Sequence, residues 1–312
     1  MEALAVVLHE PERLELSRLA LTAPDEADVV VDVEFSGIST GTEKLLWQGK
    51  MPHFPGMGYP LVPGYESVGR ISQAPHGSKF QIGERVFVPG AKCFGEIRGL
   101  FGGAASRLVV PAARIIPIDD HLGERGVLLA LAATAYHAAP AGGPQPDLIV
   151  GHGVVGRLLA RLVIANGAPA PTVWETNPLR QEGAEGYSVI NPDNDTHRGY
   201  KCICDASGDS ALLDQLIGRM APGGEIVLAG FYSERMAFNF APAFMREMRL
   251  RIAAQFVESD VLAVKQLVTD GRLSLDGLIT HRAGPAQANA AYQTAFTNPD
   301  CLKMVLNWSA AA

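Results

Sequence analysis

A Gly-x-Gly-x-x-Gly motif at residues 151–156 constrains the fold of this chain more than any other sequence feature. A short apolar run, Asp147–Val150, precedes the motif, and the residues after it are apolar at helical spacing. This order predicts a strand, a tight turn and a helix. Gly151 allows the turn, Gly153 lets a pyrophosphate approach the backbone, and Gly156 lets the helix pack closely on the strand. Because the amide groups and the dipole at a helix start favour an anion, the motif indicates a dinucleotide site.

A second predicted strand supports this interpretation. Pro171–Glu175 is largely apolar and ends in a carboxylate 19 residues after Gly156. At this spacing an acidic side chain can accept hydrogen bonds from the adenosine ribose hydroxyls. The charge of Glu175 would repel a 2′-phosphate, so the sequence predicts NAD as the cofactor, although Arg180 keeps NADP open as an alternative. The other interpretation is an ordinary strand–helix turn without a ligand.

Loops that follow successive parallel strands line a dinucleotide crevice. Asp205–Gly208 and Ala229–Phe231 each follow a predicted strand. The cofactor-binding residues predicted on these grounds are Gly151, Gly153, Val154, Val155, Gly156, Glu175, Arg180, Ala206, Ser207 and Gly230. The two later loops could instead be ordinary turns.

Composition excludes several classes of function. The net charge is −7 and no run of Lys or Arg occurs, so nucleic acid is not expected as a partner. No apolar run approaches the ~18 residues of a membrane span, and no signal peptide is visible at the N-terminus, so we expect a cytoplasmic protein. The four cysteines are expected to be buried free thiols rather than a disulfide or a metal site; they are Cys93, Cys202, Cys204 and Cys301.

The 312 residues are enough for about two domains. Residues 1–120 contain short β-branched or alternating runs broken by Gly and Pro, which predict a β-rich domain. Its expected strands are Ala3–Leu8, Val29–Phe35, Glu66–Ile71, Arg85–Val88 and Ser106–Val110. Residues 119–139 are apolar at helical spacing. Strands and helices alternate through residues 121–271, which indicates an α/β fold with a doubly wound parallel sheet, and residues 272–312 end in one helix and one strand.

Four motifs, in their order along the chain, resemble those of the medium-chain dehydrogenase/reductase superfamily. They are Ser36–Glu43, Gly64–Gly69, Gly83–Val86 and Gly151–Gly156. The resemblance implies a GroES-like catalytic domain over residues 1–120, to which the chain returns at 272–312, and a Rossmann domain over residues 121–271. It also implies a substrate cleft between the domains, a homodimer, and a place for Thr134 near the nicotinamide carboxamide. The alternative for Thr134 is a threonine in a helix interior.

Many members of this superfamily hold a catalytic zinc, and this sequence departs from them at the ligand positions. Alignment of the motifs places Thr40, Tyr65 and Ala130 where zinc ligands stand, and none of the three is a good zinc ligand. The four-cysteine lobe of a structural zinc is reduced to Cys93. We therefore expect no bound metal. The alternative is a rebuilt zinc site, for which the candidate ligands are His53, His137 and Glu66.

Three longer blocks resemble a narrower branch of the superfamily, the dehydrogenases that act on bacteriochlorophyll precursors. The blocks are residues 36–66, 98–104 and 128–137. The resemblance implies that a 3-(1-hydroxyethyl) group on a tetrapyrrole macrocycle is oxidised to 3-acetyl, with NAD⁺ accepting the hydride. One alternative is a zinc-free quinone or enone oxidoreductase, usually NADPH-linked, against which Glu175 argues. Another is a non-catalytic NAD-binding scaffold, against which the intact glycine motif argues.

Without a metal, the proton of the alcohol must pass to a side chain or a relayed water. The hypothesis from the sequence is that Tyr65 and Thr42 bind the alcohol oxygen and relay its proton, with His137 or Glu66 as the acceptor. Neutral tyrosine is a poor base, so it needs a nearby cation, for which Lys44 is a candidate. The alternatives are structural: Tyr65 fills the space left by zinc, Glu66 pairs with an arginine, and His137 is a packed helix residue.

A flat, apolar macrocycle needs wide apolar walls with few polar anchors. The Pro/Gly-rich loop at residues 51–59 and the tip at residues 100–103 supply apolar side chains. The predicted substrate-binding residues are Met51, His53, Phe54, Tyr59 and Phe101. The alternative is that the loop at residues 51–59 packs only on its own domain.

Overall fold

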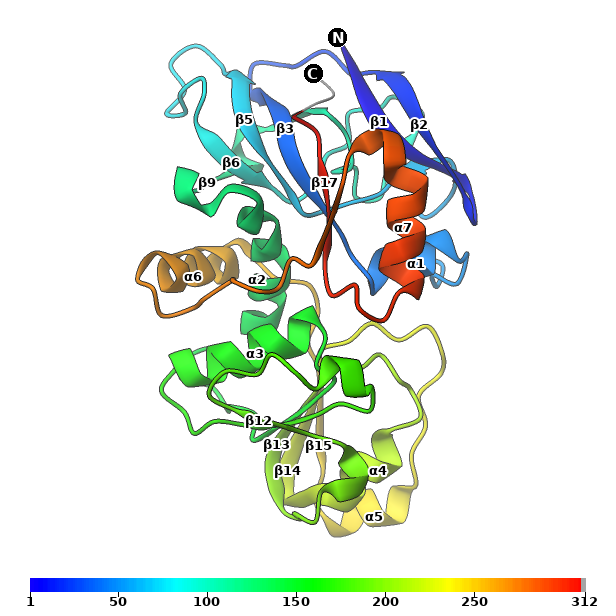
Figure 1. Ribbon diagram of the computed structural model, residues 1–312, viewed down its shortest axis with the longest axis vertical. Coiled ribbons are helices and arrows are strands. Elements are labelled where there is room, and N and C mark those ends of the chain that lie inside the picture. Colours follow the sequence, from blue (N-terminus) through cyan, green and yellow to red (C-terminus); the bar gives the residue numbers. More distant parts are fainter. Residues whose placement is uncertain (310–312) are drawn as a thin grey trace. The chain divides into compact units, whose positions relative to one another are not determined.

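The computed structural model of the chain describes residues 1–309, so the last three residues of the expected return at 272–312 lie outside the described residues. The chain forms two compact units (Figure 1). The first consists of Met1–Ala130 together with the segment from Leu278 onward, and the second consists of Leu131–Gly277. Within residues 1–309, no helix is both long and apolar enough to span a membrane.

The first unit is built mainly of β-strands. Its strands are β1 (Glu2–Glu10), β2 (Arg13–Ala20), β3 (Asp28–Ile38), β4 (Leu61–Val62), β5 (Ser67–Gln73), β6 (Arg85–Val88), β7 (Arg98–Gly99), β8 (Arg107–Pro111), β9 (Ile116–Pro117), β16 (His281–Ala283) and β17 (Met304–Asn307). One sheet has the order β2-β1-β4-β7, and the other has the order β16-β17-β3-β5-β6-β9, with β8 also paired to β3. Its α-helices are α1 (Thr42–Trp47) and α7 (Ala288–Thr297).

The C-terminal segment completes this first unit. Strand β17 pairs antiparallel with β3, with Met304 opposite Ile38 and Leu306 opposite Ser36. Figure 1 shows β17 beside β3, although the two strands come from opposite ends of the chain. Trp308 and Val305 are buried in the unit. Residues near position 300 therefore belong to the same core as residues near position 40.

The second unit contains a six-stranded parallel sheet with the order β12-β11-β10-β13-β14-β15. Its strands are β10 (Leu148–Val150), β11 (Thr172–Trp174), β12 (Ser188–Ile190), β13 (Tyr200–Asp205), β14 (Met220–Leu228) and β15 (Arg249–Ile252). Its α-helices are α3 (Val154–Ala165), α4 (Leu213–Arg219), α5 (Phe240–Met245) and α6 (Glu258–Thr269). The strand order reverses direction at β10, as in a doubly wound sheet, and the glycine motif follows that strand.

The boundaries of the units differ from those expected at residues 120 and 271. The 3₁₀ helix η2 (Asp120–Leu128) packs on β3, β5 and β6 of the first unit and buries Val127 and Leu128 there. The apolar run at residues 119–139 does not form one continuous helix, since Gly123 has a non-helical backbone (φ 51°, ψ −131°) inside η2. The α-helix α2 starts only at Leu129 and ends at Ala138, so it contains the junction between the units.

Several elements were not expected from the sequence. They are β2, β4, β7, β9, β12, β16, α1 and α5. Pro222, Gly223 and Gly224 favour a turn by residue type, yet they lie inside β14, where the pairing with β13 shifts register between Tyr200 and Cys202. The irregular pairing absorbs the glycines without ending the strand.

The close packing of α3 on β10 gives a first testable prediction. A Cβ at Gly156 would overlap the backbone oxygen of Gly151, so Gly156→Ala must push the helix away from the glycine turn. We expect a loss of about 1–3 kcal/mol in the free energy of unfolding, measured with urea.

Gly218→Ala is a matched control for this prediction. Gly218 also lies within a helix of the second unit, α4, and has no atom within 4 Å of a built Cβ. Alanine there should leave stability unchanged or raise it by up to ~1 kcal/mol. Equal unfolding midpoints for the two variants would show that the α3–β10 contact is not the constraint that we describe.

Candidate active site

The glycine turn presents an open face at the start of α3. Gly151 has φ +94°, a backbone conformation that other residues rarely adopt, and Gly156 has no room for a side chain. Gly153, by contrast, has nothing within 4 Å of a built Cβ, and it is the residue just before α3. A phosphate could therefore approach the backbone at Gly153 and the first helical residues, Val154 and Val155, where the helix dipole favours negative charge.

Glu175 lies beside this turn and is held by backbone groups. Its Oε2 accepts a hydrogen bond from the His152 N–H (3.0 Å), and its Oε1 accepts one from the Asn177 N–H (2.8 Å). A carboxylate has about four acceptor positions, so two remain for a diol such as a ribose. The residues predicted for the adenosine end of a dinucleotide thus come together within one unit, and the donors and acceptors present fit that ligand.

The loop after β13 lies next to the glycine turn, and the loop after β14 lies next to the loop after β13. A Cβ built on Gly151 would lie 3.3 Å from Ser207 Cα, and one built on Gly230 would lie 3.0 Å from the Gly208 nitrogen. The Ser207 N–H (2.9 Å) and hydroxyl (2.6 Å) both donate to Oδ1 of the buried Asp205, and burial raises the pKa of that carboxyl. Ala206 donates its N–H to the Val150 carbonyl.

The other two predicted cofactor residues also belong to the second unit. Thr134 is half-buried on α2, and Arg180 ends the short 3₁₀ helix η3 (Pro178–Arg180) after β11. The Arg180 carbonyl contacts the His152 ring, 2.6 Å from Nδ1. Their assignment to a cofactor remains a prediction.

A cluster of hydroxyl groups forms in the first unit around Tyr65. The Tyr65 hydroxyl lies 2.7 Å from Ser39 Oγ and also bonds the side chain of Thr42, the first residue of α1. The Phe101 ring packs edge-on against Tyr65, with centroids 5.6 Å apart. The structure therefore brings together Tyr65, Thr42 and Phe101, and it adds Ser39, which the sequence analysis missed because a serine in a turn carries no distinctive signal.

Glu66 lies in a fully buried ion pair, not in an accessible acid–base position. Its Oε2 pairs with Nζ of Lys303, which also donates to the Ile38 carbonyl (3.1 Å). Burial raises the pKa of Glu66, and the charge of Lys303 opposes that shift. The structural alternative for Glu66 named an arginine as its partner, and the structure has a lysine from the C-terminal segment instead. No hydrogen-bond partner of Glu66 Oε1 lies among the described residues.

Glu43 is a second buried carboxyl, and the sequence analysis did not single it out. Its Oε1 accepts a hydrogen bond from the Ser39 N–H (3.1 Å), and the Tyr292 hydroxyl donates to its Oε2 (2.9 Å). Burial, and next the nearby charge of Glu66, raise the pKa of Glu43 to about 8, while Lys303 partly offsets the shift. Glu43 therefore fixes the Ser39 turn as a largely protonated acid at neutral pH.

The expectation that a cation makes Tyr65 a better base is not met in the structure. Burial, and next the charge of Glu66, raise the pKa of Tyr65 well above its ordinary value of 10. Lys44 is not among the main influences on this pKa. Tyr65 is therefore a neutral hydrogen-bonding group, because its surroundings disfavour the phenolate.

His137 belongs to the second unit, where it has a carboxylate partner. Its Nδ1 lies 2.8 Å from Oδ2 of Asp260, and the same oxygen accepts the Val257 N–H at the start of α6. The pair joins the last turn of α2 to the first turn of α6. A role for His137 as proton acceptor remains a prediction.

The five predicted substrate residues lie in the first unit with different exposures. Met51 is 8% exposed and belongs to the core, so it offers little surface to a ligand. Phe54 and Tyr59 are half-buried against the same core, and the Tyr59 hydroxyl donates to the Leu46 carbonyl. His53 is exposed. Much of the loop at residues 51–59 thus packs on its own unit, as the alternative interpretation held.

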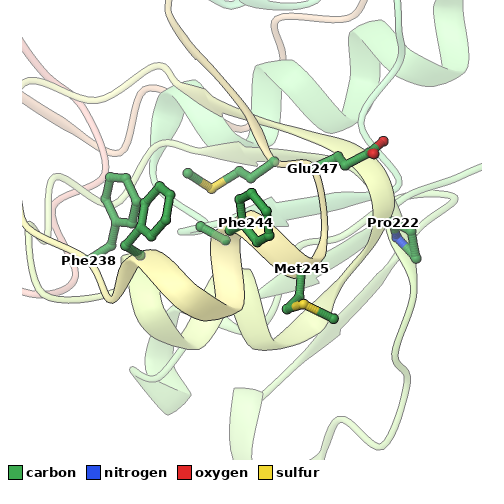
Figure 2. A pocket seen from close by; sticks show the side chains of 8 residues that line it. Pro222, Phe238, Phe244, Met245 and Glu247 are labelled. Carbon is green, nitrogen blue, oxygen red and sulfur yellow. The ribbon is translucent and has the colours of Figure 1, made fainter.

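An apolar hollow of about 740 Å³ lies elsewhere in the second unit, around α5 (Figure 2). Phe238 and Phe244 line it, and Figure 2 shows the Glu247 carboxylate pointing away from the Phe244 ring. Pro222, which also lines it, lies near the amino end of β14. The glycine turn follows the carboxyl end of a parallel strand, so the hollow belongs to the opposite edge of the sheet and contains none of the predicted site residues.

Among residues 1–309, no group of three or more His, Cys, Asp or Glu side chains gathers in a way that could hold a metal ion. Thr40, Tyr65 and Ala130 stand at the positions aligned with zinc ligands. The four cysteines are free and buried, as expected.

Comparisons with known proteins agree with this fold. Residues 25–120 match the alcohol dehydrogenase GroES-like domain. The chain is 56% identical to the 2-desacetyl-2-hydroxyethyl bacteriochlorophyllide A dehydrogenase of Rhodobacter capsulatus over 313 residues, and 55% identical to the protein of the same name from Cereibacter sphaeroides over 318 residues; each match covers 100% of both chains. A short chain alcohol dehydrogenase from Escherichia coli CFT073, solved with NADH, has a TM-score of 0.83 at 20% identity, covering 98% of this chain and 99% of that one.

The buried Glu43 predicts a pH-dependent stability that Glu43→Gln should remove. The folded pKa of about 8 lies above the ordinary value of 4.5, so the folded state keeps a proton that the unfolded chain releases. The stability from this proton is complete below pH 4.5 and is lost as the pH rises to about 8. Glutamine mimics the protonated acid, so the variant should gain stability relative to the wild type across this window, in urea unfolding at a series of pH values.

Glu26→Gln, at an exposed position, is the control for this series. Its unfolding free energy should run parallel to that of the wild type at every pH. A Glu43→Gln curve that also ran parallel would contradict the assignment of a raised pKa to Glu43.

Proposed function

Because the chain belongs to the family of 2-desacetyl-2-hydroxyethyl bacteriochlorophyllide A dehydrogenases, we propose that it oxidises the hydroxyethyl group of a bacteriochlorophyllide to an acetyl group, with a nicotinamide dinucleotide as hydride acceptor. The observation that carries this proposal is the identity of 56% over the full length of both chains. The glycine turn and Glu175 supply the cofactor site that such a reaction needs.

NAD is the proposed form of the cofactor. Both oxygens of Glu175 are bonded by backbone N–H groups, which hold the carboxylate where a ribose diol would lie. A 2′-phosphate at the same place would meet that negative charge. The preference should appear as a lower dissociation constant for NADH than for NADPH in fluorescence titrations.

The hydroxyl cluster of the first unit is the proposed site for the alcohol oxygen. A bound nicotinamide would take the hydride from the carbinol carbon. As the hydride leaves the carbon, the alcohol oxygen must release its proton, so it needs neutral groups that can both accept and donate a hydrogen bond and pass that proton on to water. Tyr65 and Thr42 have this chemistry, and Ser39 extends the chain of hydroxyls from Tyr65. We assign the relay to these hydroxyls and not to Glu66, because Glu66 forms a buried ion pair with Lys303.

Phe101 is the proposed wall for the macrocycle nearest to Tyr65. Its ring packs edge-on against Tyr65 and is half-buried, so part of it remains available to a flat apolar ligand. His53 and Phe54 are further candidates on the loop at residues 51–59. Met51 is too deeply buried for this role in the present conformation.

Tyr65→Phe tests the assignment of the relay. Loss of the hydroxyl should lower kcat by about 10²-fold or more while the dissociation constant of NADH stays unchanged, because the cofactor site belongs to the other unit. Oxidation of the hydroxyethyl substrate is followed by the absorbance change of the macrocycle.

Tyr200→Phe makes the same chemical change at a buried tyrosine of the second unit, outside the predicted sites, whose hydroxyl donates to Asp195. It should retain turnover. Near-normal turnover in Tyr65→Phe would instead mean that Tyr65 is a packing residue. No absorbance change with the wild-type protein, NAD⁺ and the hydroxyethyl substrate would overturn the proposed function itself.

We also propose that the reaction needs no zinc, because the three aligned ligand positions carry Thr40, Tyr65 and Ala130. Prolonged treatment with a chelator should leave turnover unchanged, and elemental analysis of the purified protein should find far less than one zinc per chain. Activity that is lost on chelation and restored by zinc would contradict this proposal.

A further inference from the structure

We propose that Arg157 and His152 are positioning residues that set the preference for NAD over NADP by clamping the loop at residues 177–187 to the glycine turn. This inference rests on the proposed function and extends it to residues that do not touch the adenosine themselves. Neither side chain has a role in the glycine motif as the sequence presents it.

The Arg157 guanidinium donates hydrogen bonds to backbone carbonyls of two segments. Its Nε donates to the His152 carbonyl (3.1 Å) inside the glycine turn. Its Nη1 and Nη2 donate to three carbonyls of the loop after β11, namely those of Arg180 (3.1 Å), Glu182 (2.7 Å) and Gly183 (3.2 Å). The side chain is only 8% exposed. Charge-assisted hydrogen bonds of this kind are among the stronger ones in proteins, so the two segments are joined firmly.

His152 makes a second connection between the same two segments. Its ring is fully buried, with Nδ1 2.6 Å from the Arg180 carbonyl and Nε2 2.8 Å from the Tyr187 hydroxyl. Burial lowers the pKa of His152 to about 4, so the ring is neutral at physiological pH. A neutral ring can donate from Nδ1 to the carbonyl and accept from Tyr187 at Nε2, which satisfies both nitrogens.

The clamp acts on Glu175 because each of its two carboxylate oxygens is bonded to one of the clamped segments. One carboxylate oxygen is held by the N–H of His152, and the other by the N–H of Asn177, where the clamped loop begins. In addition, the Gln181 side chain donates to the Glu175 carbonyl (2.8 Å). If the loop moves away from the glycine turn, the carboxylate loses the arrangement that fixes it.

A fixed carboxylate at Glu175 discriminates between NADH and NADPH better than a mobile one. A 2′-phosphate can be accommodated if Glu175 swings aside, and that movement would have to break its bonds to both segments. With Arg157 in place the two segments stay together, so NADPH meets the full repulsion, whereas the diol of NADH meets acceptors already in position. Loss of the clamp should therefore weaken NADH binding and relieve the penalty against NADPH.

The test uses Arg157→Met, which keeps an unbranched apolar stem on α3 and removes all four hydrogen bonds. We expect the ratio of the NADPH to the NADH dissociation constant to fall by about tenfold, the effect of one strong hydrogen bond. In the cofactor-free protein, amide hydrogen exchange should rise in residues 177–187. Both constants are measured by fluorescence titration, without turnover.

Arg161→Met is the matched control. Arg161 lies one turn further along α3 and also donates to loop carbonyls, those of Ser274 and Asp276, which belong to neither the glycine turn nor the loop after β11. Its loss should leave the ratio of dissociation constants at the wild-type value.

Gly183→Ala tests the clamp from the loop side and keeps the test decisive if Arg157→Met does not fold. A Cβ at Gly183 would lie 2.6 Å from Nη1 of Arg157, at a backbone φ of +78°, so alanine must move the loop and the guanidinium apart, whichever of the two shifts. The ratio should fall as in Arg157→Met. If exchange rises in either variant while the ratio stays at the wild-type value, or if both affinities fall equally, the inference is overturned. If the wild-type protein binds NADPH as tightly as NADH, both the cofactor preference and this inference are overturned. If the wild type prefers NADH and the variants keep the same ratio of dissociation constants, only the clamp is overturned.

Discussion

The first unit depends on a fully buried ion pair between Lys303 and Glu66. Removing one partner would leave an uncompensated charge in the core, which costs about 3–5 kcal/mol. The pair therefore commits the C-terminal segment to its place, with β17 antiparallel to β3 and Lys303 also bonded to the Ile38 carbonyl. A Cβ at Gly37 would overlap the Glu66 carboxylate, so this glycine makes room for the pair. Tyr65 directly precedes Glu66 in the chain, so its position depends on a contact with a residue more than two hundred positions later.

Burial acts in the same direction on three acidic groups in and around the hydroxyl cluster. It raises the pKa of Tyr65, of Glu66 and of Glu43, while only Lys303 supplies an opposing charge to the two carboxyls. The surroundings of Tyr65 therefore favour neutral groups that share protons through hydrogen bonds over a strong base. Such surroundings suit the proposed relay, in which hydroxyl groups pass on the proton of an alcohol.

The second unit is organised by backbone groups instead. Gly156 brings α3 against the turn, Glu175 is held by two backbone N–H groups, and Arg157 bonds four backbone carbonyls. The likeness to solved alcohol dehydrogenases at about 20% identity shows the fold alone, and that fold depends on few side chains. The full-length identity to the bacteriochlorophyllide dehydrogenases is what connects the fold with a substrate.

The sequence by itself determined the alternation of strands and helices, the glycine turn and the acidic end of β11, because each is encoded within a few neighbouring residues. It also placed Tyr65 and Thr42 together through motif alignment, and the structure joins them. The boundary expected at residue 120 lies before η2, whereas the structure assigns η2 to the first unit. Its packing on the strands of that unit decides this, and no local sequence pattern shows it. Short elements such as α1 and β12 were missed for the same reason.

Only the tertiary structure determined which buried charged groups and hydroxyls become partners. Lys303 and Glu66 are 237 residues apart, Tyr292 and Glu43 are 249 apart, and no local spacing relates either pair. In α3 the sequence pattern reveals only the apolar face of the helix. The structure shows that Arg157, in the same helix, donates to a carbonyl of the loop after β11. The cause in each case is burial: a charge or hydroxyl removed from water must find its partner in space, and the fold determines which partner is within reach.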